Sequence, residues 1–292
     1  MIAFARSVRD YFAFIKFSHT VFAMPFALIG FSLAVSKQES GLSIRLLLLV
    51  ILCMILARNT AMGFNRLADK DFDARNPRTS RREIPSGIIS VRAATAFVII
   101  NACLFIVITG FINRLTLFLS PVALLVIIGY SLTKRFTSLS HFVLGLGLSL
   151  APIGAYISVT GKFSILPLIY SFIVLTWVSG FDIIYALQDD EFDKSNRLFS
   201  IPAAVGRKKA IGISIFVHII TFGLVLAAGF YDKSGILFWI GAAVFIILLV
   251  FQHSIVRYDN LSKVNIAFGT TNGIASLVFA FFVILDLVFK IQ

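Results

Sequence analysis

The chain has 292 residues, of which 59% are apolar and 14% are charged, and its mean hydropathy is +0.95. Soluble domains are about 45–50% apolar and about 25% charged, so this composition excludes an ordinary soluble domain. The formal net charge of +12 comes from basic residues that gather between long apolar runs. That distribution is typical of membrane topology and argues against nucleic-acid binding.

The apolar runs predict an all-α integral membrane protein. A helix needs about 20 apolar residues to cross a bilayer. Nine runs meet that requirement, at 17–36, 43–64, 92–111, 115–132, 140–160, 164–187, 210–230, 234–252 and 264–287. We therefore predict one membrane-embedded domain over residues 1–292, with an interfacial amphipathic helix at 1–16, where basic and aromatic residues alternate.

Lysine and arginine are enriched in short cytoplasmic loops, and their positions predict the orientation. The N-terminal segment and alternate loops hold most of them. We therefore expect the N-terminus and the loops 65–91, 133–139, 188–209 and 253–263 to be cytoplasmic. An odd number of spans then places the C-terminus outside.

The carboxylates are concentrated in two short segments on this same side. Nine of the fourteen acids are Asp69, Asp71, Asp73, Glu83, Asp182, Asp189, Asp190, Glu191 and Asp193. Acids contribute little to topology, so membrane orientation does not explain the two clusters.

The spacing within the clusters predicts a cation site. Asn65, Asp69 and Asp73 recur every four residues and share one face if the helix persists, as do Asp189 and Asp193. Like charges at this spacing repel, and acids near a membrane are costly enough to indicate function. Mg²⁺ binds through one or two carboxylates plus substrate phosphates. Two facing acid stripes therefore predict a Mg²⁺-bridged diphosphate, although either cluster taken alone also fits a solvated surface loop.

Basic residues follow both acid clusters. They are Arg75, Arg78, Arg81 and Arg82 after the first and Lys194, Arg197 and Arg207 after the second. Because the guanidinium group binds phosphate in a bidentate manner, each segment has the composition of a phosphate site.

These motifs resemble the two signatures of the UbiA-type prenyltransferase family. The first is Asn65-Arg66-x-x-Asp69-x-x-x-Asp73-x-x-x-x-Arg78-Thr79-x-x-Arg82, closing with Ile84-Pro85-Ser86-Gly87, and the second is Asp182-x-x-Tyr185-Ala186-x-Gln188-Asp189-x-x-x-Asp193. The likeness covers nearly the whole chain, including a tyrosine–lysine element at Tyr130-Ser131-Leu132-Thr133-Lys134-Arg135. The segment Ile15-Lys16-Phe17-Ser18-His19-Thr20 is similar to the opening of bacterial 4-hydroxybenzoate polyprenyltransferases.

The resemblance implies a fold, a location and a reaction. It implies a bundle of nine membrane helices in the bacterial inner membrane, with a central cavity opening under cytoplasmic loops. The reaction is Mg²⁺-dependent transfer of a polyprenyl group from its diphosphate to the ring of 4-hydroxybenzoate or a related aromatic acid, in ubiquinone or other quinone biosynthesis. A naphthoate of menaquinone biosynthesis is the alternative acceptor. Membrane lipid surrounds the chain, and no obligate protein partner is expected.

The resemblance also implies roles for individual residues. Asn65, Asp69, Asp73, Asp189 and Asp193 would hold Mg²⁺, and the four aspartates would be catalytic. The residues expected to bind diphosphate are Arg66, Arg78, Arg82, Lys134 and Arg135. Contacts to substrate are expected from Tyr130, Asp182, Tyr185 and His19. Two positions depart from the pattern: Glu83 stands where many members have proline, and Arg197 where many have glycine.

Arg58 lies within the second apolar span, where a charge costs about 2.5–3.5 kcal/mol on insertion scales. We expect it to face the bundle interior and meet the carboxylate of the acceptor, with snorkelling to the cytoplasmic edge as the alternative. The histidines His141, His218 and His253 have no metal-like spacing, so zinc chemistry is not predicted.

Two other protein classes have acids in membranes. A transporter places them near the bilayer midplane, often beside helices interrupted by glycine or proline, whereas these acids cluster at one face. A phosphatidyl-group transferase has one continuous aspartate motif on a single helix pair, whereas here the acids lie on two distant loops.

Overall fold

The structure is a computed structural model that describes residues 10–16, 22–37 and 42–289. The described residues form helices and turns, with one isolated bridge between Arg257 and Asn260 and no strand. The helices are α2 (Met24–Val35), α3 (Ile44–Ala68), α4 (Lys70–Arg75), α5 (Val91–Gly110), α6 (Arg114–Thr133), α7 (Ser140–Thr160), α8 (Ile165–Ala186), α9 (Asp190–Ser195), α10 (Ile201–Val205), α11 (Arg207–Tyr231), α12 (Ile236–Ile255), the π-helix η2 (Ile266–Thr271) and α13 (Asn272–Phe289).

The predicted all-α membrane bundle is confirmed. Eight helical segments in the described part of the chain are long and apolar enough to cross a bilayer, the last being η2 continued by α13. The first predicted span, 17–36, corresponds to α2, which has only 12 residues, while residues 17–21 lie outside the described residues. Of the predicted interfacial segment 1–16, residues 10–14 are helical.

Polar side chains fix where several helices begin. Ser43, Ser90 and Ser200 each accept a hydrogen bond from a backbone N–H in the first turn of α3, α5 and α10. Asn113 and Thr116 form a reciprocal capping box at the start of α6. These caps satisfy N–H groups that a helix leaves without partners at its N-terminus.

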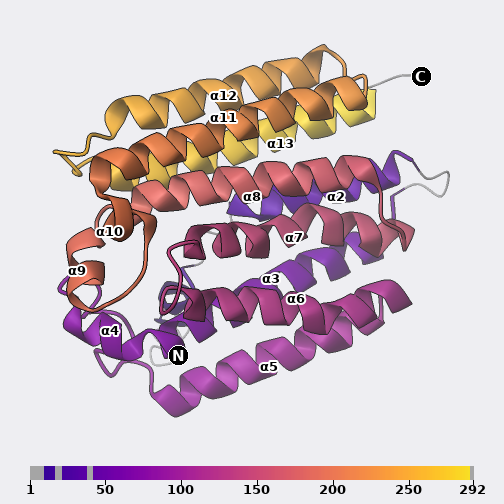
Figure 1. The fold of residues 1–292 in the computed structure, drawn as a ribbon. Helices are drawn as coiled ribbons and strands as arrows, with labels where there is room; N and C mark the ends of the chain where they lie inside the picture. Colours follow the sequence, from indigo (N-terminus) through magenta and orange to yellow (C-terminus); the bar gives the residue numbers. More distant parts are fainter. Residues whose placement is uncertain (1–9, 17–21, 38–41, 290–292) are drawn as a thin grey trace.

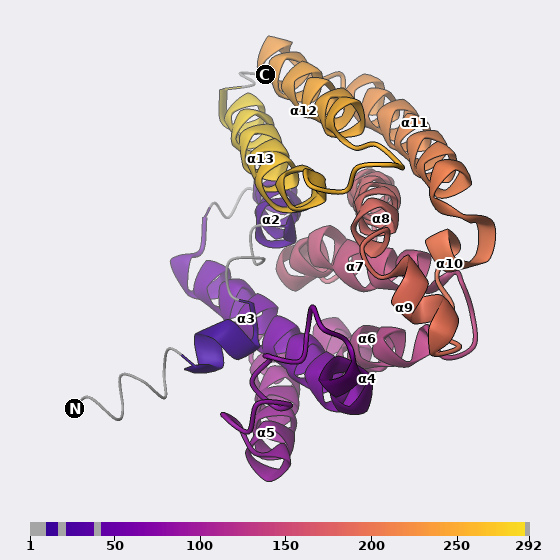
Figure 2. The ribbon, with the colours of Figure 1, turned by 90° about the vertical axis from the view of Figure 1, so that its left-hand side faces the viewer.

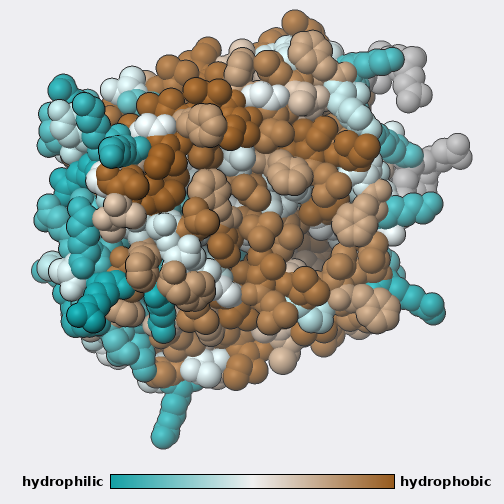
Figure 3. Space-filling view, viewed as in Figure 1, coloured by the Kyte–Doolittle hydropathy of each residue, from teal (hydrophilic) through white to brown (hydrophobic). Residues whose placement is uncertain are grey.

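The short helices gather at one end of the bundle. The long helices run side by side, with α4, α9 and α10 at the end where α3 and α8 finish (Figure 1). Seen from that end, α4 and α9 lie in front of the long helices (Figure 2). In the face shown in Figure 3, hydrophilic residues cover the same end and apolar residues cover the middle. The predicted loops 65–91 and 188–209 therefore share one polar surface.

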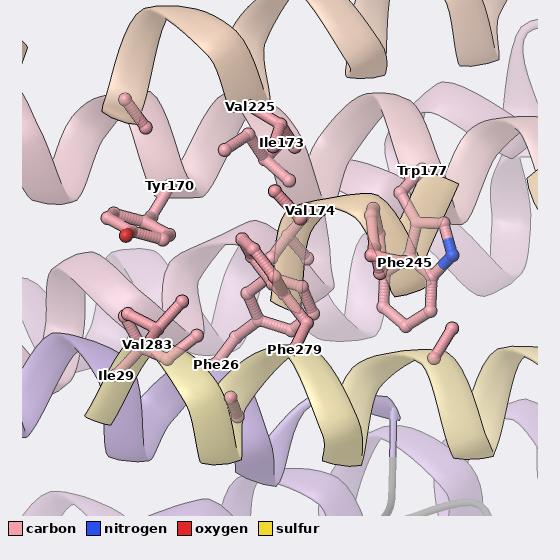
Figure 4. Packing of buried hydrophobic residues seen from close by; sticks show 14 of the residues in the cluster. Phe26, Ile29, Tyr170, Ile173, Val174, Trp177, Val225, Phe245, Phe279 and Val283 are labelled. Atoms are coloured by element: carbon pink, nitrogen blue, oxygen red, sulfur yellow. The ribbon is translucent and has the colours of Figure 1, made fainter. Parts of the chain in front are cut away.

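The hydrophobic core is concentrated on one side of the bundle. Trp177 of α8 is fully buried, with ring centroids 5.3 Å from Phe26 of α2 and 5.7 Å from Phe245 of α12 (Figure 4). Its indole N–H donates to Asn272 Oδ1 at 2.9 Å, which satisfies the polar atom in an apolar core. In the apolar window of α8, 67% of residues are buried, against 22% in α3 and α5. The second acid segment therefore follows the most buried of these helices.

Two glycines allow backbones to approach closely. A Cβ on Gly30 of α2 would collide with the backbone of Pro152 in α7. A Cβ on Gly145 of α7 would collide with the carbonyl of Leu175 and the hydroxyl of Ser179 in α8. Small residues at such positions are typical of helix pairs in membranes.

We predict that Gly145→Ala lowers the thermal unfolding midpoint in detergent, because the new methyl group meets a backbone carbonyl that cannot rotate away. Overpacking costs about 1–3 kcal/mol, and each kcal/mol corresponds to about 2–4 °C in a chain of this size class. Gly212→Ala in α11 is the control, since its Cβ would meet open space. Equal midpoints for the two variants would contradict the close α7–α8 contact.

Candidate active site

The two acid stripes are built by the same local structure. At the end of α3, Asp69 has φ −95° and ψ 6° and begins α4. After α8, Asp189 has φ −113° and ψ 4° and begins α9. In each case the N–H of the second aspartate, Asp73 or Asp193, donates to the carbonyl of the first at 2.7 Å. The continuous helix that the sequence suggested is therefore a long helix, a break at aspartate and a six-residue helix.

Both stripes line one cavity of about 570 Å³. The predicted site residues on its wall are Arg58, Asn65, Arg66, Asp69, Asp73, Arg78, Arg82, Tyr130, Lys134, Asp182, Tyr185, Asp189 and Asp193. Below this charged rim the cavity is apolar and continues to Thr116 of α6 and Ser158 of α7, at the opposite ends of those helices. Residues about 120 positions apart in the sequence thus share one chamber.

Two predicted residues are not placed on the wall. Arg135 lies outside it: its Nη2 donates to the Ala68 carbonyl at 2.6 Å, and its guanidinium lies 5.7 Å from the centroid of Phe72. His19 lies outside the described residues.

Arg78 joins the two acid segments. Its Nε donates to Asp189 Oδ1 at 2.9 Å, its Nη2 pairs with Asp189 Oδ2, and its Nη1 donates to the Tyr185 hydroxyl at 3.1 Å. Asn76 also donates to Asp189 Oδ1, at 3.1 Å. Burial alone would raise the pKa of Asp189, but the hydrogen bond and charge of Arg78 outweigh it and hold that pKa below its ordinary value. Asp189 is therefore ionised at neutral pH.

Asp73 is neutralised within its own loop. Arg82 Nη1 donates to both of its carboxylate oxygens, at 2.7 and 2.9 Å. The Thr79 hydroxyl donates to the Asp73 carbonyl at 3.2 Å and holds the loop against α4.

Asp69 and Asp193 lack an arginine partner among the described residues. Asp69 accepts a hydrogen bond from Asn65 Nδ2 at 3.1 Å, and burial raises its pKa to about 6. Asp193 Oδ2 lies 3.5 Å from Lys134 Nζ and is buried without a hydrogen bond. Burial would lower the pKa of Lys134, but Asp193, Asp189 and neighbouring acids raise it overall. These two carboxylates therefore have less positive charge beside them than Asp73 and Asp189.

This donor set fits Mg²⁺. Carboxylate and amide oxygens are the ligands that this ion prefers, and it commonly retains waters and substrate phosphates in its shell. Within the described ranges, no three His, Cys, Asp or Glu side chains are close enough to form a closed protein site.

Arg58 and Arg66 face the cavity and also hold the N-terminal segment. Arg58 Nη2 donates to the carbonyls of Ile15 at 3.1 Å and Lys16 at 2.6 Å. Arg66 is buried, and its Nε donates to the Phe14 carbonyl at 3.4 Å. Arg58 therefore lines the cavity while its Nη2 hydrogen bonds go to the backbone.

Sequence reasoning missed two residues of the site. Asn76, three residues after Asp73, binds Asp189 in the other segment. His141, near the start of α7, lies 2.7 Å from Asp182 Oδ2 through its Nδ1. Asn76 lies inside the first signature, so its position could have been predicted to belong to the site. The pair of His141 and Asp182 depends on how α7 packs against α8, which the sequence pattern does not give.

The two departures from the family pattern have different surroundings. Arg197 adopts φ +56°, the left-handed conformation that favours glycine. The Glu83 Oε2 atom is buried without a hydrogen bond from the described residues.

Comparison with known proteins agrees with this geometry. The sequence profile of the UbiA prenyltransferase family matches residues 23–284. A 4-hydroxybenzoate octaprenyltransferase of Nitrosomonas eutropha is 30% identical over 236 residues, covering 80% of this chain and 82% of the relative. The enzyme of the same name from Nitrosomonas europaea is 30% identical over 246 residues, covering 84% and 83%.

Solved structures share the fold. The apo structure of a UbiA homologue from Aeropyrum pernix K1 has a TM-score of 0.80 and 26% identity, covering 94% of this chain and 98% of that one. A UbiA homologue from Archaeoglobus fulgidus bound to GPP and Mg²⁺ has a TM-score of 0.76 and 20% identity, covering 96% and 99%. With the profile match across most of its length, the chain belongs to the UbiA prenyltransferase family.

Proposed function

We propose that the chain transfers a polyprenyl group from polyprenyl diphosphate to the ring of 4-hydroxybenzoate or a related aromatic acid, with Mg²⁺ held at the acid rim. One observation carries this proposal: both acid stripes and their arginines form the rim of a single apolar cavity. A charged rim suits the diphosphate, and an apolar interior suits the hydrocarbon. The names of the Nitrosomonas relatives and the GPP and Mg²⁺ in the Archaeoglobus fulgidus homologue support the same assignment.

The length of the cavity supports a polyprenyl substrate. Its wall extends along α6 from Lys134, at the charged end, to Thr116. These residues are eighteen positions apart, which corresponds to about 27 Å along a helix at 1.5 Å per residue. An extended chain of several isoprene units fits along this wall.

The proposed ligands of the ion are Asn65, Asp69, Asp73, Asp189 and Asp193. When bound, Mg²⁺ supplies positive charge to the diphosphate as it leaves. Arg66, Arg78, Arg82 and Lys134 bind phosphate oxygens and stabilise the charge that grows on them as the allylic C–O bond breaks. Apolar walls keep water from the carbocation, so the electron-rich ring is its nearest nucleophile.

We assign the orientation from the positions of the basic residues. The rim lies at the polar end formed by loops 65–91 and 188–209, which we assign to the cytoplasm of a bacterial cell, with the protein in the inner membrane. The diphosphate head group of the prenyl donor and the water-soluble aromatic acid then approach the site from the cytoplasmic side. The acids lie at this end of the helices, where a transporter would place them near the midplane.

We predict that Asp193→Asn lowers the rate of prenyl transfer at least about 10²-fold, by analogy with the loss of one charge-stabilising group in an active site. The assay supplies membranes with Mg²⁺, a labelled polyprenyl diphosphate and a panel containing 4-hydroxybenzoate and hydroxynaphthoates. Asp71→Asn is the matched control, since Asp71 is an exposed acid of α4 outside the cavity. Full activity in Asp193→Asn, or no product with any aromatic acid, would contradict the proposal.

The Asp69 carboxyl predicts a pH-dependent stability. Its pKa is raised from 3.8 to about 6 by burial, so the folded state binds this proton more tightly than the unfolded chain. The stabilisation is complete below about pH 4 and is lost as the pH rises through 6. Without Mg²⁺, we therefore expect Asp69→Asn to have a higher thermal midpoint than the wild type at pH 7.5, and little difference at pH 4.

Mg²⁺ should reverse this ranking. A cation that binds only the folded wild type raises its midpoint at pH 7.5, whereas Asp69→Asn gains less. Asp71→Asn again serves as the control and should respond like the wild type. An equal response of all three proteins to Mg²⁺ would show that Asp69 is not a ligand.

We further predict that Arg58→Leu raises the KM for the aromatic acid more than the KM for polyprenyl diphosphate. Arg58 faces the cavity and fixes the backbone of Ile15 and Lys16 beside it. Arg92→Leu, an exposed residue at the start of α5, is the control. Unchanged KM and kcat in Arg58→Leu would remove this residue from the acceptor site.

A further inference from the structure

Asp182 differs from the four aspartates of the rim. It lies seven residues before Asp189, about 10 Å deeper along the helix direction, and its side chain is 20% exposed on the cavity wall. Its partner is His141, and no lysine or arginine among the described residues forms a salt bridge with it. Asp182 therefore lies below the level of the diphosphate site, towards the apolar chamber.

The tautomer of His141 follows from its two neighbours. The backbone N–H of Ile201 donates to His141 Nε2 at 3.3 Å, so this nitrogen carries a lone pair. The other nitrogen, Nδ1, then carries the hydrogen and donates it to Asp182 Oδ2 at 2.7 Å. His141 is fully buried, and in this tautomer its Nδ1 hydrogen holds Asp182 Oδ2 in place.

The second oxygen of Asp182 is available. Within the described residues, Oδ1 accepts no hydrogen bond, whereas Oδ2 is held by His141. A carboxyl group inside a membrane helix is costly and indicates function. The geometry presents one oriented, basic oxygen to the chamber in which the ring and the allylic carbon must meet.

We propose that Asp182 is the general base of ring prenylation and that His141 is its positioning residue. This inference rests on the proposed function. The allylic C–O bond breaks and its electron pair leaves with diphosphate. A ring π pair forms the new C–C bond. The hydrogen on the same ring carbon then passes as a proton to Asp182 Oδ1, the C–H pair restores aromaticity, and the proton leaves with the diphosphate product.

Ile201 connects the Asp182–His141 pair to the loop 188–209. Ile201 begins α10 in the loop 188–209, and its N–H reaches His141 in α7. The loop that carries Asp189 and Asp193 therefore also orients the imidazole that holds Asp182. The fold of this loop therefore fixes the positions of two proposed metal ligands and of the carboxyl group of Asp182 together.

The decisive experiment compares wild type with Asp182→Asn, using an aromatic acid deuterated at the ring carbon that receives the prenyl group. We expect Asp182→Asn to lower kcat by about 10²–10⁴-fold, the usual contribution of general base catalysis. In the wild type, C–O cleavage precedes proton loss, so deuteration should leave kcat unchanged. In Asp182→Asn, proton loss becomes slow, and the deuterated acid should react measurably more slowly than the protonated one.

Two further variants separate chemistry from folding. His141→Leu removes the positioning hydrogen bond, so it should show the same isotope effect with a smaller loss of kcat. Ser179→Ala is the matched control, because the Ser179 hydroxyl donates to the backbone carbonyls of His141 and Leu175 between the same two helices without touching Asp182. It should show neither the isotope effect nor the loss of kcat.

Three results would overturn the inference. The first is that Asp182→Asn retains the wild-type kcat. The second is that Asp182→Asn is slow but converts the protonated and deuterated acids at equal rates, which would assign Asp182 to substrate binding or to C–O cleavage. The third is that Ser179→Ala reproduces the isotope effect, which would attribute the effect to the packing of α7 against α8. A wild type that forms no ring product with any aromatic acid would overturn the proposed function as well, and that outcome is distinct from these three.

Discussion

The ion pair between Arg78 and Asp189 is the interaction on which the site depends. It joins residues 111 positions apart, and Asn76 reinforces it from the same loop. The acids at the ends of α3 and α8 would otherwise repel one another in a region of low dielectric, where Coulomb energies are far larger than in water. With one arginine shared across the gap, two loops of like composition close over a single chamber.

Much of this site could be predicted from the local periodicity of the sequence. Apolar runs predicted the spans, and four-residue spacing placed Asp69 near Asp73 and Asp189 near Asp193, because both signals depend only on neighbours along the chain. Which carboxylate each arginine binds depends on how the loops pack, so it could not be predicted from the sequence. Arg82 binds Asp73 in its own loop, whereas Arg78 crosses to Asp189. Arg135 follows Lys134 directly, and adjacent residues in a helical turn point about 100° apart, so only one reaches the cavity.

The two sides of the bundle have different tasks. The side built around Trp177 is filled with aromatic rings from α2, α8, α12 and α13. The side formed by α3, α6 and α7 surrounds the chamber, which side chains such as Cys53, Met54 and Leu119 line. Because α8 belongs to both, the packed side fixes the acids and the base that face the chamber.

The breaks at Asp69 and Asp189 have the same local structure. The stretches 69–76 and 189–196 share Asp, Phe, Asp and Asn at the same four positions, and in both the final asparagine N–H donates to the phenylalanine carbonyl at 3.0 Å. The two segments thus present their aspartates on the same local backbone. The proposed ligand also has two parts, since diphosphate is two phosphoryl groups about one bridging oxygen. Two acid segments of matching backbone therefore suit an anion built of two phosphoryl groups.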